Sequence, residues 1–158
     1  MNPVESVGEG SGLVLLGFGS RLLAVPLSSL VTIEHSGKLT ERQESLPGAF
    51  AALEVAGQHT PVYAFTDAFA LFDESRYPGH FCVVLRADDG ARQYALACTD
   101  VEQLRTEDEY AGLQMIPDCM QLPGNPFAGL FMRDGKLVLT ADSSSLLGYI
   151  DRQCGQHE

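Results

Sequence analysis

The chain has 158 residues, of which 45% are hydrophobic and 20% charged. This length and composition indicate one globular domain with a real core. Ten basic residues stand against 21 acidic ones, for a formal net charge of -11. No basic cluster occurs, so nucleic acid and anionic membrane surfaces are not expected partners.

Short apolar runs separated by turn residues dominate the chain from Leu13 onward. Four pairs of such runs predict β-hairpins: Leu13–Phe18 with Arg21–Val25, Ala51–Val55 with His59–Ala64, Phe81–Arg86 with Gln93–Cys98, and Phe127–Arg133 with Lys136–Ala141. Further strands are predicted at Leu30–Glu34 and Met115–Met120. Regular short strands of this kind favour an all-β barrel or sandwich.

Helical signals are few. Thr66 predicts a helix start for Thr66–Phe72, and Asp142 one for Ser143–Ile150, while Pro26–Leu30 forms at most one turn. Both longer candidates directly follow the second strand of a hairpin. This repeated order suggests two similar β subdomains within residues 13–150, with a flexible lead-in at 1–12 and a tail at 151–158.

No motif assembles an active site, so an enzyme is not expected. Gly17-Phe18-Gly19 lacks the third glycine and the helix of a dinucleotide site, and no two histidines have zinc-pair spacing. Neither a metal nor a cofactor is expected. The scattered Cys82, Cys98, Cys119 and Cys154 predict reduced thiols, three in the core and one near the tail. The chain shows no export signal or apolar run long enough to span a bilayer, so we expect a cytoplasmic protein without membrane insertion.

Five segments in chain order resemble the CheW-like domain, the adaptor module of bacterial chemosensory arrays. They are the opening hairpin Leu13–Leu27, Leu46-Pro47-Gly48-Ala49 ("LPGAP"), Gly57–Val62 ("RG-x-x-x-PV"), Phe81–Leu104 ("VD-x-V-x-x-V") and Phe127–Leu147 ("LD-x-x-x-LL"). The resemblance covers Leu13 to about Ile150. It implies a mainly β fold of two small five-stranded SH3-like barrels packed side by side, with few short helices.

The polar signature of that family is not kept. Where the family usually has Glu, Arg, Asp and Asp, this chain has Thr32, Ala56, Ala64 and Thr99 respectively. Two explanations remain open: drift in an adaptor with a restricted partner, or a partner groove with a changed specificity.

The resemblance implies a non-catalytic adaptor that couples a chemoreceptor to a CheA-type histidine kinase. Its partners would be the kinase regulatory domain and the helical tip of a methyl-accepting receptor. The residues expected to line the partner surface are Thr32, Glu34, Glu54, Ala56, Gly57, His59 and Val101. Two alternatives stay open: an accessory CheW-like protein of a type IV pilus (twitching motility) or surface-sensing pathway, and a small-molecule-binding β-barrel.

Overall fold

A computed structural model describes residues 12–40, 48–66, 69–71, 79–87, 90–105, 112–117, 119 and 125–155. Its strands are β1 (Leu13–Phe18), β2 (Arg21–Pro26), β3 (Leu30–His35), β4 (Ala51–Val55), β5 (Gln58–Tyr63), β6 (Phe81–Ala87), β7 (Arg92–Cys98), β8 (Asp100–Leu104), β9 (Gln114–Met115), β10 (Gly129–Arg133) and β11 (Lys136–Thr140). Two short 3-10 turns, η1 (Leu27–Ser29) and η2 (Ser36–Lys38), flank β3, and one long helix, α2 (Ser143–Gly155), follows β11.

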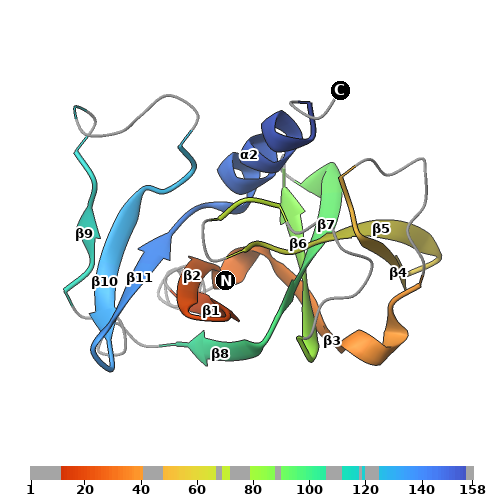
Figure 1. The fold of residues 1–158 in the computed structure, drawn as a ribbon, viewed down its shortest axis with the longest axis horizontal. Helices are drawn as coiled ribbons and strands as arrows, with labels where there is room; N and C mark the ends of the chain where they lie inside the picture. The colour runs from red at the N-terminus through yellow and green to blue at the C-terminus, as the bar shows by residue number, and fades with distance from the viewer. Residues whose placement is uncertain are drawn as a thin grey trace, which may run out of the picture.

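The strands form two sheets, as Figure 1 shows. One sheet has six strands in the order β8-β1-β2-β11-β10-β9, and the other has five in the order β3-β6-β7-β5-β4. The predicted mainly β architecture with two β subdomains is confirmed. The first sheet has six strands instead of the expected five, because the two-residue strand β9 pairs with β10.

The two sheets draw on different parts of the chain. The five-stranded sheet comes from residues 30–98, whereas the six-stranded sheet joins the hairpin β1–β2 to the late strands β8–β11. A parallel pairing of β2 with β11 joins the two parts of the six-stranded sheet, with Leu22 opposite Val138. The five-stranded subdomain is therefore an insertion within the six-stranded one.

Three clusters of buried side chains explain why several strands are apolar on both faces. Within each subdomain, one cluster fills the inside of the sheet: Leu15, Phe131 and Val138 in one, Leu53, Val84 and Ala95 in the other. The third and largest cluster lies between the sheets and includes Val14, Leu16, Val83, Leu85 and Leu96. Neighbouring residues such as Val83 and Val84 thus face different cores, as the period of two requires.

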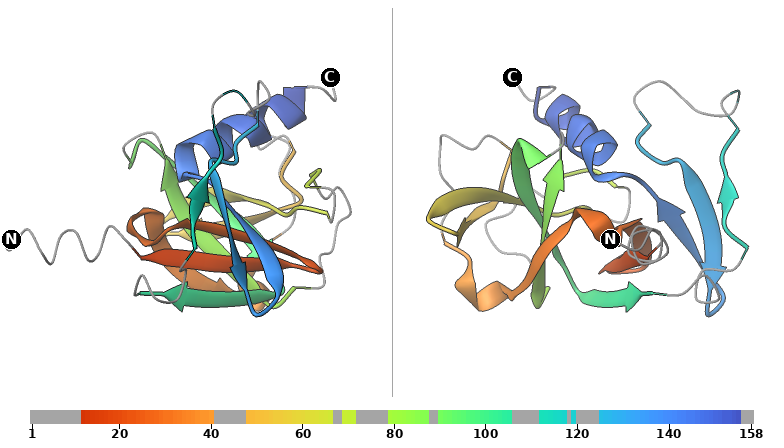
Figure 2. Two further views of the ribbon diagram at one scale, coloured as in Figure 1. Left: turned by 90° about the vertical axis from the view of Figure 1, so that its left-hand side faces the viewer. Right: turned by 180° about the vertical axis from the view of Figure 1, so that it is seen from behind.

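Helix α2 covers the junction of the two sheets (Figures 1 and 2). Leu146, Leu147 and Ile150 are buried in the cluster between the sheets. Asp142 caps the helix, because its Oδ1 accepts a hydrogen bond of 2.8 Å from the Ser145 N–H. This confirms the predicted start.

The end of α2 differs from the prediction. The helix runs to Gly155 instead of Ile150, so the expected tail at 151–158 is helical over its first five residues. Arg92 pairs with Asp151 at 2.8 Å, and Cys154 packs against Gly48. These contacts with the five-stranded subdomain hold the last turn of the helix.

The predicted helix at Thr66–Phe72 is wrong over its described part. Thr66 and residues 69–71 form a closed loop in which the Thr66 N–H donates to the Ala70 carbonyl at 2.8 Å. Phe69 has a φ of 58°, which no α-helix accommodates. Residues 67, 68 and 72 lie outside the described residues.

Candidate partner-binding surfaces

The structure places the seven residues expected at the partner surface in three separate groups. Thr32 and Glu34 lie on β3, a further four occupy the tip of the β4–β5 hairpin, and Val101 lies on β8. In both Figure 1 and Figure 2 the hairpin tip lies at one end of the molecule, away from β8. The sequence therefore names residues of several surfaces and not of one site.

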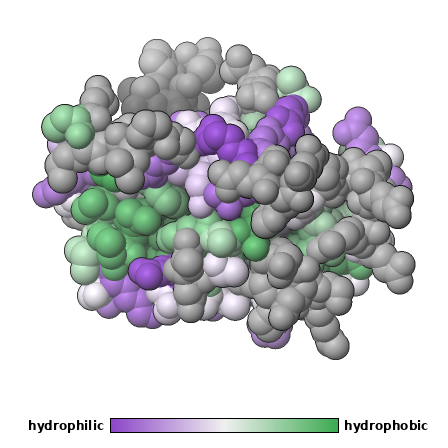
Figure 3. Space-filling view, turned by 45° about the horizontal axis from the view of Figure 1, so that its top comes forward, coloured by the Kyte–Doolittle hydropathy of each residue, from purple (hydrophilic) through white to green (hydrophobic). Residues whose placement is uncertain are grey.

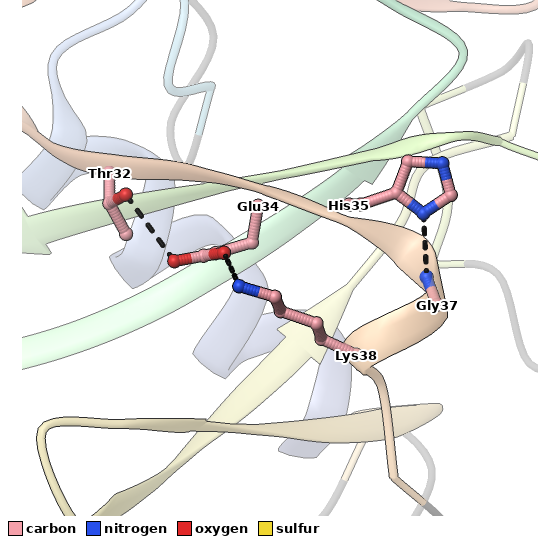
Figure 4. A network of polar contacts seen from close by, with 5 residues as sticks. All are labelled: Thr32, Glu34, His35, Gly37 and Lys38. Atoms are coloured by element: carbon pink, nitrogen blue, oxygen red, sulfur yellow. Dashed lines mark hydrogen bonds and ion pairs between the residues drawn. The ribbon is translucent and has the colours of Figure 1, made fainter.

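A small polar network covers the β3 group (Figure 4). Lys38 Nζ lies 2.8 Å from Glu34 Oε2, and Thr32 Oγ1 donates to Glu34 Oε1 at 3.5 Å. The hydrogen bond from Lys38 lowers the pKa of Glu34 below its usual value. On β3, Thr32 stands where the family has Glu, and Glu34, two residues along, carries the negative charge of this surface.

The second group forms the turn and first pairs of the β4–β5 hairpin. Glu54 lies directly opposite His59 across the two strands. The connection is the two-residue turn Ala56-Gly57, with φ values of 51° and 81°. The second strand begins one residue before the predicted start at His59, because Gln58 already pairs with Val55.

Ala56 is an unfavourable residue for this turn. Both central positions of a type I′ turn need positive φ, which favours Asn, Asp or Gly. The β10–β11 hairpin has such residues in Asp134 and Gly135, at 51° and 77°. Ala56 thus adopts a left-handed backbone conformation that an alanine side chain disfavours.

We expect Ala56→Asn to raise the free energy of unfolding by about 1 kcal/mol, because Asn tolerates positive φ better than Ala. Asp134→Ala, at the equivalent position of the other hairpin, should lower it by a similar amount. Urea titrations of both variants check this. A loss of stability in Ala56→Asn would contradict it.

Val101, the third group, borders a surface cavity of about 390 Å³ that is lined by residues of β1, β2, β8 and the β10–β11 hairpin. Charged residues are prominent in its lining, among them Asp100, Glu102 and Lys136. Arg133 forms an ion pair with Glu102 there. β8 itself was not predicted as a strand, because its sequence is largely polar and no turn residue separates it from β7.

Thr99, where the family has Asp, has a structural role here. Its backbone N–H and its Oγ1 both donate to the Gly17 carbonyl, at 2.8 and 3.0 Å. A carboxylate cannot donate the second of these bonds. The substitution therefore fits the local contact between β1 and the β7–β8 link.

The thiols occupy different environments. Cys82 and Cys98 are buried, Cys154 is half-buried and Cys119 is exposed, so the prediction of three core thiols is wrong for Cys119. Burial raises the pKa of Cys82 to about 12 and also raises that of Cys98. Neither thiol is a thiolate near neutral pH, which does not suit a nucleophile.

Within the described ranges, no three His, Cys, Asp or Glu residues come close enough together to hold a metal ion. In the same residues, no helix has the length and apolar character needed to cross a membrane.

Exposed apolar side chains gather at one end of the six-stranded sheet, which the sequence analysis did not single out. Five large apolar residues are exposed in the part of the chain that the structure describes, and four of them lie on or beside β9, β10 and β11: Leu113, Met115, Met132 and Leu137. The sequence contains a signal for this surface. The runs of β10 and β11 are apolar at consecutive positions, which predicts two faces that both avoid water, although only one faces a core.

Comparisons with known proteins support the fold. No protein-family model matches the chain, and no curated protein matches it either. The crystal structure of the scaffolding protein TtCheW from Thermoanaerobacter tengcongensis is similar, with a TM-score of 0.62 and 12% identity over 85% of this chain and 90% of that one. The chain therefore has a CheW-like fold.

Proposed function

We propose that the chain is a non-catalytic cytoplasmic adaptor that couples a chemoreceptor to a CheA-type histidine kinase. The observation that carries the proposal is the CheW-like fold, which extends over 85% of the chain and 90% of a scaffolding protein. Five family-like segments in the same chain order support it independently.

The packing of the subdomains favours an adaptor over a small-molecule-binding barrel. In the described strands, side chains such as Leu53, Phe131 and Val138 fill the inside of each sheet. The cavities lie at the surface and are lined in part by exposed residues. Protein partners that bind such surfaces need apolar contacts with a polar rim and no reactive group.

The proposal predicts direct binding to the regulatory domain of a CheA-type kinase. Titration calorimetry with the regulatory domain of a CheA-type kinase from the same organism should give saturable binding at tens of micromolar or tighter. The helical tip of a methyl-accepting receptor from that organism should bind as a second partner. Absence of binding to any such kinase domain would reject the adaptor function.

The tip of the β4–β5 hairpin tests whether partner specificity has changed. Ala56 already has positive φ and is exposed, so Ala56→Arg adds a charge without a new backbone cost. We propose that the surface around Glu54 and His59 is matched to its partner, so this charge should weaken receptor binding. Gly57→Val, which forces a β-branched residue to a φ of 81°, should damage turn and binding together.

The opposite result separates the two explanations. If Ala56→Arg leaves the affinity for the native receptor unchanged or improves it, the missing Arg reflects drift. In that case the residue at position 56 gives no support to an accessory role in a type IV pilus or surface-sensing pathway.

A further inference from the structure

One face of the β10–β11 hairpin is apolar and partly exposed to solvent. Met132 lies opposite Leu137, and Leu130 lies opposite Leu139. Directly opposed residues project to the same face of a sheet. Met132 is 56% and Leu137 49% exposed, whereas Phe131, which projects to the other face, is buried inside the subdomain. We call these four residues the β10–β11 face.

A groove of about 250 Å³ runs beside the β10–β11 face. Its lining residues are Ser20, Arg21, Leu22, Phe69, Lys136, Leu137 and Leu139. Figure 3 shows apolar surface over this end of the molecule, at the left of the view. The groove thus lies between the six-stranded sheet and the loop that follows β5.

Contacts behind the groove hold its far wall in place. The ring of Phe69 packs edge-on against Phe127, with 5.0 Å between centroids. The Phe69 carbonyl accepts a hydrogen bond of 2.7 Å from the Tyr149 hydroxyl of α2. This wall is therefore fixed before any partner arrives, which lowers the entropy cost of binding.

The charge of the groove is opposite to that of the chain. Among the residues that the structure describes, its lining includes Arg21 and Lys136 and no acidic residue, although the net charge of the protein is -11. Asp134 and Glu102 line the cavity beside β8, which shares Leu22 and Lys136 with this groove. A positive groove on a negative protein selects a negatively charged partner segment.

We propose that this groove binds an amphipathic helix of a partner protein, with an apolar stripe against the β10–β11 face and Asp or Glu residues beside Arg21 and Lys136. A helix fits better than an added strand, because β9 occupies one edge of β10 and β2 the outer edge of β11. Sheet faces, unlike edges, receive helices through apolar side chains spaced at i, i+3 and i+4. The proposal depends only on this surface and not on the adaptor function.

The test uses the full chain and two synthetic 18-residue helical peptides. Both have Leu at i, i+3, i+4 and i+7, and one has Glu and the other Lys at the flanking positions. At low salt we expect the Glu peptide to bind and to shift the NMR amide signals of β10, β11 and residues 69–71. Leu137→Glu should weaken this binding at least tenfold, and Arg21→Glu combined with Lys136→Glu should reverse the preference towards the Lys peptide.

Met115→Glu is the matched control. Met115 is 66% exposed on the same sheet but lies opposite Gly129, so it projects to the face of Phe131 and away from the groove. Its substitution should leave the affinity for the Glu peptide unchanged.

Equal binding of both peptides, shifts confined to other strands, or an equal loss in Met115→Glu would overturn the proposal. Binding of the kinase regulatory domain to the same variants distinguishes the two functions. If the protein binds the kinase domain but not the Glu peptide, only the groove proposal is rejected. If it binds the peptide but no kinase domain, only the adaptor function is rejected.

Discussion

Raising the pH from 8 to 11 is expected to lower the free energy of unfolding by about 3 kcal/mol through Cys82 alone. Burial, and to a lesser degree the charge of Glu34, raises the pKa of this thiol from 9.0 to about 12. The thiol therefore ionises at a lower pH in the unfolded chain than in the folded protein. The stabilisation is complete below pH 9 and is lost as the pH rises towards 12, at about 1.4 kcal/mol per pH unit.

Other buried groups add to this loss of stability as the pH rises. Burial raises the pKa of Cys98, and those of Tyr63 and Tyr94, above their usual values. Because tyrosines in an unfolded chain ionise near pH 10, the interval between pH 9 and 10 reports mainly on the thiols.

Urea unfolding under reducing conditions at a series of pH values measures this slope. Cys82→Ala should flatten it between pH 9 and 10, at some cost in packing, while Cys119→Ala should leave it unchanged because Cys119 is exposed. A constant free energy of unfolding from pH 8 to 11 would show that the two thiols are not buried as described.

Gly48→Ala is expected to destabilise the fold by about 2–4 kcal/mol, from overpacking and from an unfavourable backbone conformation. Gly48 has a φ of 81°, and a Cβ at this position would overlap the Sγ of Cys154 in the last turn of α2. The substitution must therefore rotate the Cys154 side chain out of its position or displace the end of the helix or the loop before β4.

The double variant Gly48→Ala with Cys154→Ala separates the two causes. Removal of the thiol should recover the overpacking part, leaving roughly 1 kcal/mol for the positive φ. Denaturant unfolding of the two single variants and the double variant completes the cycle. Strictly additive effects would mean that the two residues do not meet in solution.

Turn chemistry made the hairpins predictable from the sequence, since each turn depends on residues next to one another. Asp134-Gly135 predicts a type I′ turn, and the structure has positive φ at both positions. The same local logic failed at Thr66. Its Oγ1 accepts from the Ala70 N–H at 3.2 Å within a closed loop, and no helix begins there over the described residues.

The predicted helix at Thr66 does not form because of contacts with residues that are distant in the sequence. Phe69 packs against Phe127, and its carbonyl binds Tyr149, 80 residues along the chain. A local capping signal is worth about 1 kcal/mol, and such tertiary contacts outweigh it. The groove was unpredictable for the same reason, because its walls join Leu22, Phe69 and Leu137.

The candidate site shows a similar division. The sequence located the β4–β5 turn and the charged residues of β3, but it could not tell that they lie on surfaces distinct from β8. Spacing along the chain carries no information on which strand edges of two barrels lie side by side.

The inserted arrangement of the subdomains has a consequence for the order of folding. Residues 30–98 contain every strand of the five-stranded sheet, so this sheet can pair as soon as they leave the ribosome. The hairpin β1–β2 is made first, yet its partner β11 is made more than 100 residues later. Until then Leu15 and Ala24, on the other face of this hairpin, lack Phe131 and Val138, with which they form a buried cluster in the folded protein. Strand pairing between segments so far apart in the sequence is slow. We therefore expect the unpaired β1–β2 hairpin to be the part of the nascent chain most prone to aggregation.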